Sequence, residues 1–278
     1  MNDTYSQRWV NSIEKLAIAN DFEGFVALYP EALNAVSEVQ ALKVLVRHGN
    51  LPMVEFALAT SQELPNMDLS SVVHKGAMMG QVQTTAAVFE WCKTHNTFVT
   101  PQPYLFKLAI GAACGNCVPV LEQYWPEIKK MNKESLNNIY INAATHDSVE
   151  CLEFLRPLLK YVDGFHSGMV RQTARSYKHR ALVYLLRNPP EFFNTKREAG
   201  DALLMLLEND PLKSEEARTT VQSLFEFVTA PEFLHRFRDI FKPSMLRAVD
   251  ELYVGHQKNV LQAAVKGSKP QTHTARKM

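Results

Sequence analysis

The sequence lacks the features that mark secreted, membrane-spanning or disordered proteins. Nowhere do 18 apolar residues follow one another, and the polar start from Met1 to Leu16 lacks the apolar stretch of a secretory signal. The 278 residues include only 11 glycines and 14 prolines and no low-complexity tract, which argues against long disordered segments. We therefore expect a cytoplasmic protein without a membrane span, while export by a route that needs no cleaved signal stays open.

Cysteine is also scarce. The four residues lie inside apolar helical patterns, which favours a reducing compartment: Cys92, Cys114, Cys117 and Cys151. Cys114 and Cys117 have the spacing of a redox pair or of half a zinc site. A zinc site needs two more ligands, and no suitable Cys or His pair lies near them in the sequence. A thioredoxin-like centre would need a preceding strand. We therefore interpret Cys117 as a small buried apolar residue.

Familiar catalytic motifs are missing as well. The sequence has no phosphate-binding glycine loop, no Gly-x-Ser-x-Gly elbow and no His-Glu-x-x-His pair. It therefore predicts no enzyme, no catalytic residue, no metal site and no cofactor. An enzyme would need an unfamiliar site, which we would place in the C-terminal helices.

What the sequence does contain is a six-fold repeat. Its reference positions lie 29, 31, 35, 31 and 31 residues apart: Asn20, Gly49, Gly80, Gly115, His146 and Tyr177. An aliphatic residue stands seven positions before each: Ile13, Leu42, Val73, Leu108, Ile139 and Val170. Three positions before each stands an alanine, with Val46 as the one exception: Ala17, Val46, Ala77, Ala112, Ala143 and Ala174. A period of this length is typical of stacked-repeat proteins, which usually bind another macromolecule.

Each unit reads as a helix, a tight turn and an antiparallel helix. In the second unit, two short apolar patterns are interrupted at Gly49 and Asn50. Glycine supplies the left-handed residue that ends a helix, and Pro52 suits the first turn of the next helix. Alanine before the turn lets neighbouring helices approach closely, since a larger side chain would force them apart.

The pattern resembles the ankyrin repeat from about Ile13 to Leu186, and most closely at Val73–Gly80 and Ala109–Asn116. The Thr-Pro-Leu-His start of that family is missing, and only His74 stands at its histidine position, so the repeats are degenerate. The resemblance implies an all-α solenoid of about six ankyrin-like helix-turn-helix repeats. Pairs of plain helices, as in other α-solenoids, are the alternative architecture.

After Leu186 the repeat spacing is lost. Ala199–Asn209 could begin a seventh unit, Ser214 before two glutamates is a good helix start, and Pro231 and Pro243 begin two further helices. The last helix carries one apolar face: Leu246, Val249, Tyr253, Val260 and Ala264. We predict a repeat domain at 1–190, a helical cap or separate module at 191–266, and a basic, disordered tail at 267–278.

Charge is sorted within the repeats. The first helices of the second to sixth units, taken as 40–50, 70–80, 104–115, 136–145 and 169–177, contain six basic residues and no acidic one: Lys43, Arg47, Lys75, Lys107, Arg171 and Arg175. The second helices contain acidic residues among their bases. The resemblance to ankyrin repeats implies that the first helices line the concave side of the solenoid.

The two residues before each turn should project into that concavity: Arg47 and His48, Met78 and Met79, Ala113 and Cys114, Ala144 and Thr145, Arg175 and Ser176. This arrangement is basic at both ends with soft apolar residues between, which suits a partner with an apolar centre and acidic flanks. The predicted partner-binding residues are Lys43, Arg47, His48, Lys75, Met78, Met79, Lys107, Thr145, Arg171 and Arg175.

We therefore predict an interaction protein that binds a partially acidic protein. Degenerate ankyrin-like repeats with a helical appendix are also similar to translocated effectors of intracellular bacteria, which would place the protein in a host-cell cytosol. An enzyme or enzyme regulator with its site in 191–266 is the alternative. Nucleic-acid binding is a second alternative, although the net charge of +1 and few nearby aromatics make it the weaker one.

Overall fold

The described part of the chain is entirely helical. The computed structural model describes residues 3–34, 36–61, 64–95, 101–157, 165–190, 193–209 and 212–267, and no strand occurs among them. The chain forms two compact units, residues 1–164 and 165–278. None of the helices in the described residues is both long enough and apolar enough to cross a membrane.

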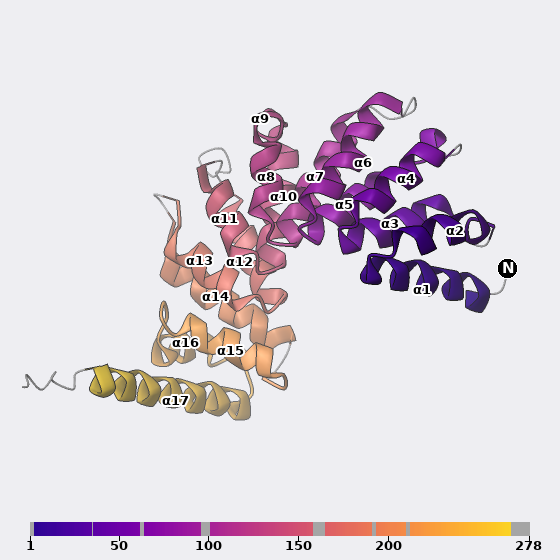
Figure 1. Cartoon of the computed structure of the whole chain (residues 1–278). Coiled ribbons are helices and arrows are strands. Elements are labelled where there is room, and N and C mark those ends of the chain that lie inside the picture. The colour runs from indigo at the N-terminus through magenta and orange to yellow at the C-terminus, as the bar shows by residue number, and fades with distance from the viewer. Residues whose placement is uncertain are drawn as a thin grey trace, which may run out of the picture. The chain divides into compact units, whose positions relative to one another are not determined.

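The first unit consists of two layers of helices (Figure 1). In one layer each helix contacts the next in the order α1 (Asp3–Ala19), α3 (Glu38–His48), α5 (Ser70–Met78), α7 (Pro101–Cys114) and α10 (Lys133–Thr145). Each of these is paired with the following helix of a second layer: α2 (Phe22–Ala32), α4 (Leu51–Thr60), α6 (Val82–His95), α8 (Val118–Gln123) and α11 (Val149–Leu155). A 3-10 turn, η1 (Leu64–Asn66), precedes α5, and the short helix α9 (Trp125–Ile128) follows α8.

The predicted helix pairs are confirmed. Each of the five predicted first helices begins no more than three residues before its expected start. The six aliphatic repeat positions are fully buried, and the six small positions are at most 5% exposed. The repeat therefore marks the positions where helices pack. Short helices are only marginally stable on their own, and burial of their apolar surface against neighbouring helices stabilises them.

Left-handed residues end the first helix of each pair: Asn20, Gly49, Gly80, Asn116, Asp147 and Tyr177. Four of the six coincide with the repeat positions. In the fourth and fifth pairs the left-handed residue comes one position after Gly115 and His146. Asn and Asp tolerate this conformation because their short side chains form local hydrogen bonds. Gly115 is therefore not the left-handed residue of its turn, and its missing side chain serves the packing of helices instead.

Gly111 and Gly115 allow the backbones of α5 and α7 to approach each other closely. A Cβ atom at Gly111 would lie 3.0 Å from the carbonyl carbon of His74 and closer still to its oxygen. A Cβ atom at Gly115 would lie 2.6 Å from the carbonyl carbon of Met78. Backbone atoms cannot turn aside as a side chain does, so larger residues here would separate the two helices.

The second unit begins with two further helix pairs. Helix α12 (His166–Arg175) contacts α13 (His179–Arg187) and α14 (Thr195–Asn209), while α13 and α14 both contact α15 (Glu215–Leu224). This is the two-layer arrangement of the first unit, so α14 and α15 continue the helix pairing beyond the predicted end of the repeats at 190. The predicted helix start at Ser214 is confirmed, because its hydroxyl accepts a hydrogen bond from the Ala217 amide at 3.1 Å.

Two helices complete the second unit. Helix α16 (Ala230–Phe237) begins with Pro231 in its first turn, and α17 (Pro243–Gly267) follows it and packs against α15 and α16. Val249 is fully buried and the Tyr253 ring lies edge-on to Phe225, whereas Val260 is half exposed. The predicted apolar face of the last helix is thus covered only in its first half. The predicted disordered tail lies outside the described residues from 268 onward.

Candidate functional site

A basic pocket lies between α3 and α5. It has a volume of about 310 Å³, and three of its six lining residues are cations that the sequence had predicted to bind a partner. The lining residues are Lys43, Val44 and Arg47 of α3 and Ser71, His74 and Lys75 of α5. Spacings of three and four residues place these side chains on one face of each helix. No acidic residue lines the pocket.

The charges around this pocket are only partly compensated. Arg47 lies 3.4 Å from the carboxylate of Glu14 on α1, and His48 approaches the same oxygen at 3.0 Å. Within the part of the chain that the structure describes, no ion pair involves Lys43, Lys75 or Lys107. Unpaired positive charge is therefore concentrated on the lysines of α3, α5 and α7 and not at Arg47.

His74 connects the pocket to the neighbouring helix α7. Its Nδ1 atom lies 3.2 Å from the carbonyl oxygen of Lys107, and because a carbonyl only accepts, Nδ1 must carry the hydrogen. Burial lowers the pKa of His74, and the charges of Lys107, Lys75 and His146 lower it further, against an opposing effect of this hydrogen bond. His74 is therefore neutral at pH 7, with Nε2 as its hydrogen-bond acceptor.

The other predicted residues of the first unit differ in accessibility. Met79 is 41% exposed at the end of α5, and Met78 is partly buried. The Thr145 hydroxyl donates to the carbonyl of Ile141 at 2.9 Å, so its hydrogen is already used. Ala113 and Ala144 are fully buried, so the prediction that they project outward is wrong. Adjacent first-layer helices pack too closely to leave these positions open.

Two predicted residues, Arg171 and Arg175, lie on α12 in the second unit. Arg171 lies 3.6 Å from Asp201 and 3.8 Å from Glu198, both on α14. Within the described residues no ion pair involves Arg175. Acidic residues of α1 and α14 thus face the two ends of the predicted basic series. The charge count from the sequence covered neither α1 nor α14. Including these two helices would have revealed their acidic residues.

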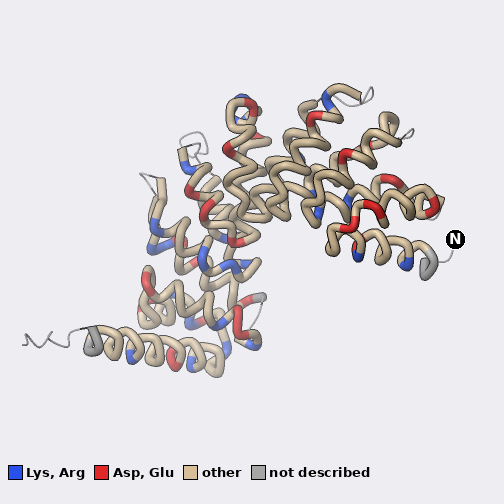
Figure 2. The backbone as a smooth tube through the Cα atoms, viewed as in Figure 1, with Lys and Arg blue, Asp and Glu red and all other residues tan. Residues whose placement is uncertain are grey.

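The first helices contain no acidic residue within the residue ranges used for the prediction, but two of them extend beyond those ranges to include one. As folded, α3 begins with Glu38, which is buried and accepts a hydrogen bond from the Ser61 hydroxyl, and α10 contains Glu134 in its exposed first turn. Both lie at helix N-termini, where a carboxylate interacts favourably with the helix dipole. Acidic residues are also visible on the second-layer helices α4, α6 and α11 (Figure 2).

The four cysteines are free thiols: Cys92 and Cys151 are buried, whereas Cys114 and Cys117 are only partly buried, so the predicted burial of Cys117 is incomplete. Burial raises the pKa of Cys92 and Cys151 to about 12 and also raises the pKa of Cys114 and Cys117. Such thiols are poor nucleophiles at pH 7 because the thiolate is the reactive form. Among the described residues, no group of three or more His, Cys, Asp or Glu side chains is placed to hold a metal ion.

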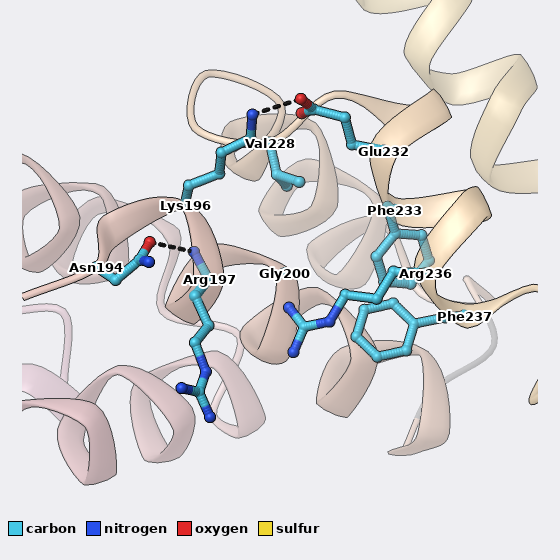
Figure 3. Close-up of a pocket in the computed structure, with 9 residues that line it drawn as sticks. All are labelled: Asn194, Lys196, Arg197, Gly200, Val228, Glu232, Phe233, Arg236 and Phe237. Carbon is cyan, nitrogen blue, oxygen red and sulfur yellow. Dashed lines mark hydrogen bonds and ion pairs between the residues drawn. The ribbon is translucent and has the colours of Figure 1, made fainter.

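A second pocket, which sequence reasoning missed, lies between α14 and α16 (Figure 3). Its volume is about 250 Å³, and its walls combine aromatic, aliphatic, cationic, acidic and amide groups: Asn194, Lys196, Arg197, Gly200, Val228, Glu232, Phe233, Arg236 and Phe237. No sequence motif connects the 194–200 and 228–237 segments. Only the packing of α16 beside α14 brings them together.

No protein-family model matches the chain, and neither the curated proteins nor the solved structures gave a significant match.

Proposed function

We propose that this chain is a non-enzymatic interaction protein built from degenerate ankyrin-like repeats, and that it binds an acidic segment of another protein. The binding surface, here called the basic face, consists of Lys43, Lys75, Lys107, His74 and the exposed end of Met79. The observation that carries this proposal is the pocket between α3 and α5, which is lined by three cations and a histidine without any acidic side chain.

The repeat architecture supports this use of the basic face. Helix pairs that stack in two layers present one side of each first-layer helix in a continuous row, and such rows serve as extended binding surfaces. The turns after Gly49 and Gly80 and the buried alanine positions agree with ankyrin-like units. Irregular connections that contain no strand in the described residues agree with their degeneracy.

The charge pattern indicates the chemistry of the partner. Lysines that lack a carboxylate partner attract acidic side chains without first breaking an internal ion pair. Exposed Met79, four residues after Lys75, offers a polarizable apolar contact. We therefore expect a segment in which aspartate or glutamate alternates with apolar residues. Arg47 contributes less than expected from the sequence, because Glu14 already neutralises it.

Charge reversal tests the proposal. The partner would be identified by affinity purification and mass spectrometry, and its dissociation constant would then be measured with Lys43→Glu/Lys75→Glu. We expect at least tenfold weaker binding, or about 1.4 kcal/mol, because two attractions become repulsions. Lys15→Glu/Lys133→Glu carries the same change in net charge away from the pocket and should bind normally. If both double variants lost the same amount of affinity while their circular dichroism stayed unchanged, the interface would not lie at this pocket.

Nucleic-acid binding is the competing interpretation of the same lysines. A duplex would contact several phosphates, so its affinity would fall steeply with salt concentration. Titration with a random duplex at about 50 and 200 mM salt distinguishes protein binding from nucleic-acid binding. A protein that makes six or more phosphate contacts typically loses ~10³-fold in duplex affinity over this range. Only three lysines belong to the basic face, so we expect weak binding and a shallow slope.

A further inference from the structure

The pocket between α14 and α16 has an apolar wall and a charged rim. Phe233 is 1% exposed and Phe237 is 6% exposed, and together with Val228 they form the wall. The rim consists of exposed polar side chains from both helices. In Figure 3 the guanidinium of Arg236 lies between Gly200 and Phe237, whereas the side chain of Arg197 extends away from both phenylalanine rings.

Gly200 keeps this pocket open. A Cβ atom at this position would lie 3.3 Å from Nη1 of Arg236 and 4.0 Å from Cε2 of Phe237, so it would point into the space between the helices. These neighbours are side-chain ends, in contrast to the backbone atoms that face Gly111 and Gly115. Glycine is thus not needed here for helix packing, and its missing side chain leaves room for a ligand.

Arg236 is held in a fixed position at the rim. Its guanidinium donates to Asp201 at 2.8 Å and lies 4.7 Å from the centre of the Phe237 ring. These contacts limit the rotamers of a long side chain, so less entropy is lost when it binds an anion. On the other side of the pocket, Lys196 forms an ion pair with Glu232 (Figure 3).

The charges around the pocket leave one cation in excess. Four cations and three carboxylates form this cluster: Arg171, Lys196, Arg197 and Arg236 with Glu198, Asp201 and Glu232. Three of the cations have a closer partner than Arg197 does. Arg197 approaches Asp201 at 4.0 Å, and its side chain is 66% exposed. Asp201 already contacts Arg236, so the charge of Arg197 is the surplus one.

We propose that this pocket binds a small monocarboxylate with an apolar body. Arg197 and Arg236 would hold the carboxylate, because the planar guanidinium matches its two oxygens. The apolar body would lie against Phe233 and Phe237. The single surplus charge matches a single negative charge, and 250 Å³ lies below the range of about 300–1,000 Å³ that suits drug-sized ligands. This site is independent of the basic face on the first unit.

Asn194 adds a donor to the same rim. Its side-chain oxygen accepts a hydrogen bond from the backbone amide of Arg197 at 3.0 Å, as drawn in Figure 3. The NH2 end of the amide is therefore the part that a carboxylate would meet. Two sources supply the proposed chemistry, a free organic acid and the C-terminal residue of another protein.

Calorimetric titration of the full chain tests the site with 3-phenylpropionate, 3-phenylpropanamide, and an acetylated tripeptide ending in phenylalanine with a free or an amidated terminus. We expect the two acids to bind and both amides to bind at least tenfold more weakly. Tighter binding of the free-terminus tripeptide than of 3-phenylpropionate would indicate a protein C-terminus as the natural ligand. Tighter binding of 3-phenylpropionate would indicate a free acid.

Variants locate the binding. Arg197→Gln removes the surplus cation and should weaken the better acid at least tenfold, whereas Arg238→Gln, also exposed in this unit, should change nothing. Gly200→Leu should abolish binding by filling the pocket. Circular dichroism would show that each variant is folded. The proposal is overturned if no acid binds at about 10 mM, if acids and amides bind alike, or if Arg197→Gln binds as the original chain does.

Discussion

Replacing Gly111 with alanine tests how closely α5 and α7 pack. In the middle of a helix this substitution ordinarily stabilises by about 1 kcal/mol, because alanine is the better helix former. Here the new methyl group would overlap the carbonyl of His74 and lie 3.1 Å from Cβ of Ala77. Moving two packed helices apart costs about 1–3 kcal/mol. The steric cost exceeds the gain, so we expect a net loss of about 1 kcal/mol.

Two other glycines provide matched controls. At Gly168 in α12 and Gly255 in α17, no atom beyond the adjacent residues and the nearby backbone of the same helix lies within 4 Å of the position that a Cβ atom would occupy. Their substitution therefore adds helix propensity without a clash. Alanine at either should stabilise by about 0.5–1 kcal/mol. Gly111→Ala should lower the free energy of unfolding, whereas alanine at either control position should raise it. The comparison therefore depends on the sign of the change and not on its size.

Urea denaturation followed by circular dichroism of the helices measures these free energies of unfolding. The slope of each transition should be equal among the variants, so that a shift in midpoint reports stability alone. The close approach would be refuted if Gly111→Ala stabilised the chain as much as Gly255→Ala. Gly111→Ala should also displace His74 from the Lys107 carbonyl, which an imidazole NMR signal would report.

Three further predictions concern individual side chains. An acidic partner on the basic face should raise the pKa of His74, so its binding should tighten between about pH 7.5 and 6, and His74→Asn should remove this dependence. Burial lowers the pKa of His166 below the ordinary 6.5, so the unfolded chain binds the proton first and stability is lost as pH falls below about 6.5. Urea midpoints at about pH 7.5 and 5.5 should therefore differ less in His166→Gln than in the original chain. Thr229→Ala should lower the free energy of unfolding by about 1 kcal/mol, because Thr229 and Glu232 form the capping box of α16. A lower urea midpoint would report this loss.

The sequence predicted the helix pairs because each pair depends on local signals. A buried aliphatic residue, a small residue and a turn residue recur within one unit, and each acts through neighbours a few positions away. Local signals of the same kind mark the starts of α15 and α16, where Ser214 and Thr229 satisfy the first free amides. In the fourth and fifth pairs the left-handed residue is Asn116 or Asp147, one position after the repeat position. Several neighbouring turn residues can adopt this conformation there, so the local sequence does not determine which of them does.

The candidate sites depended on contacts between helices that are distant in the sequence. The neutralisation of Arg47 comes from Glu14 on α1, and that of Arg171 comes from Asp201 and Glu198 on α14. The pocket at Gly200 requires α16 to lie beside α14. A periodic pattern fixes which side of a helix is buried, but it does not state which charges of the next helix face it.

The close approach of α5 and α7 also explains why the basic face is compact. Because Gly111 and Gly115 lie against the backbone of α5, the Lys107 carbonyl comes within hydrogen-bond distance of His74. The charges of Lys75 and Lys107 then both act on the same imidazole and lower its pKa. The same approach buries Ala113, so that long side chains are the groups that project from these helices. Two glycines thus determine how closely the cations of the proposed binding surface are spaced.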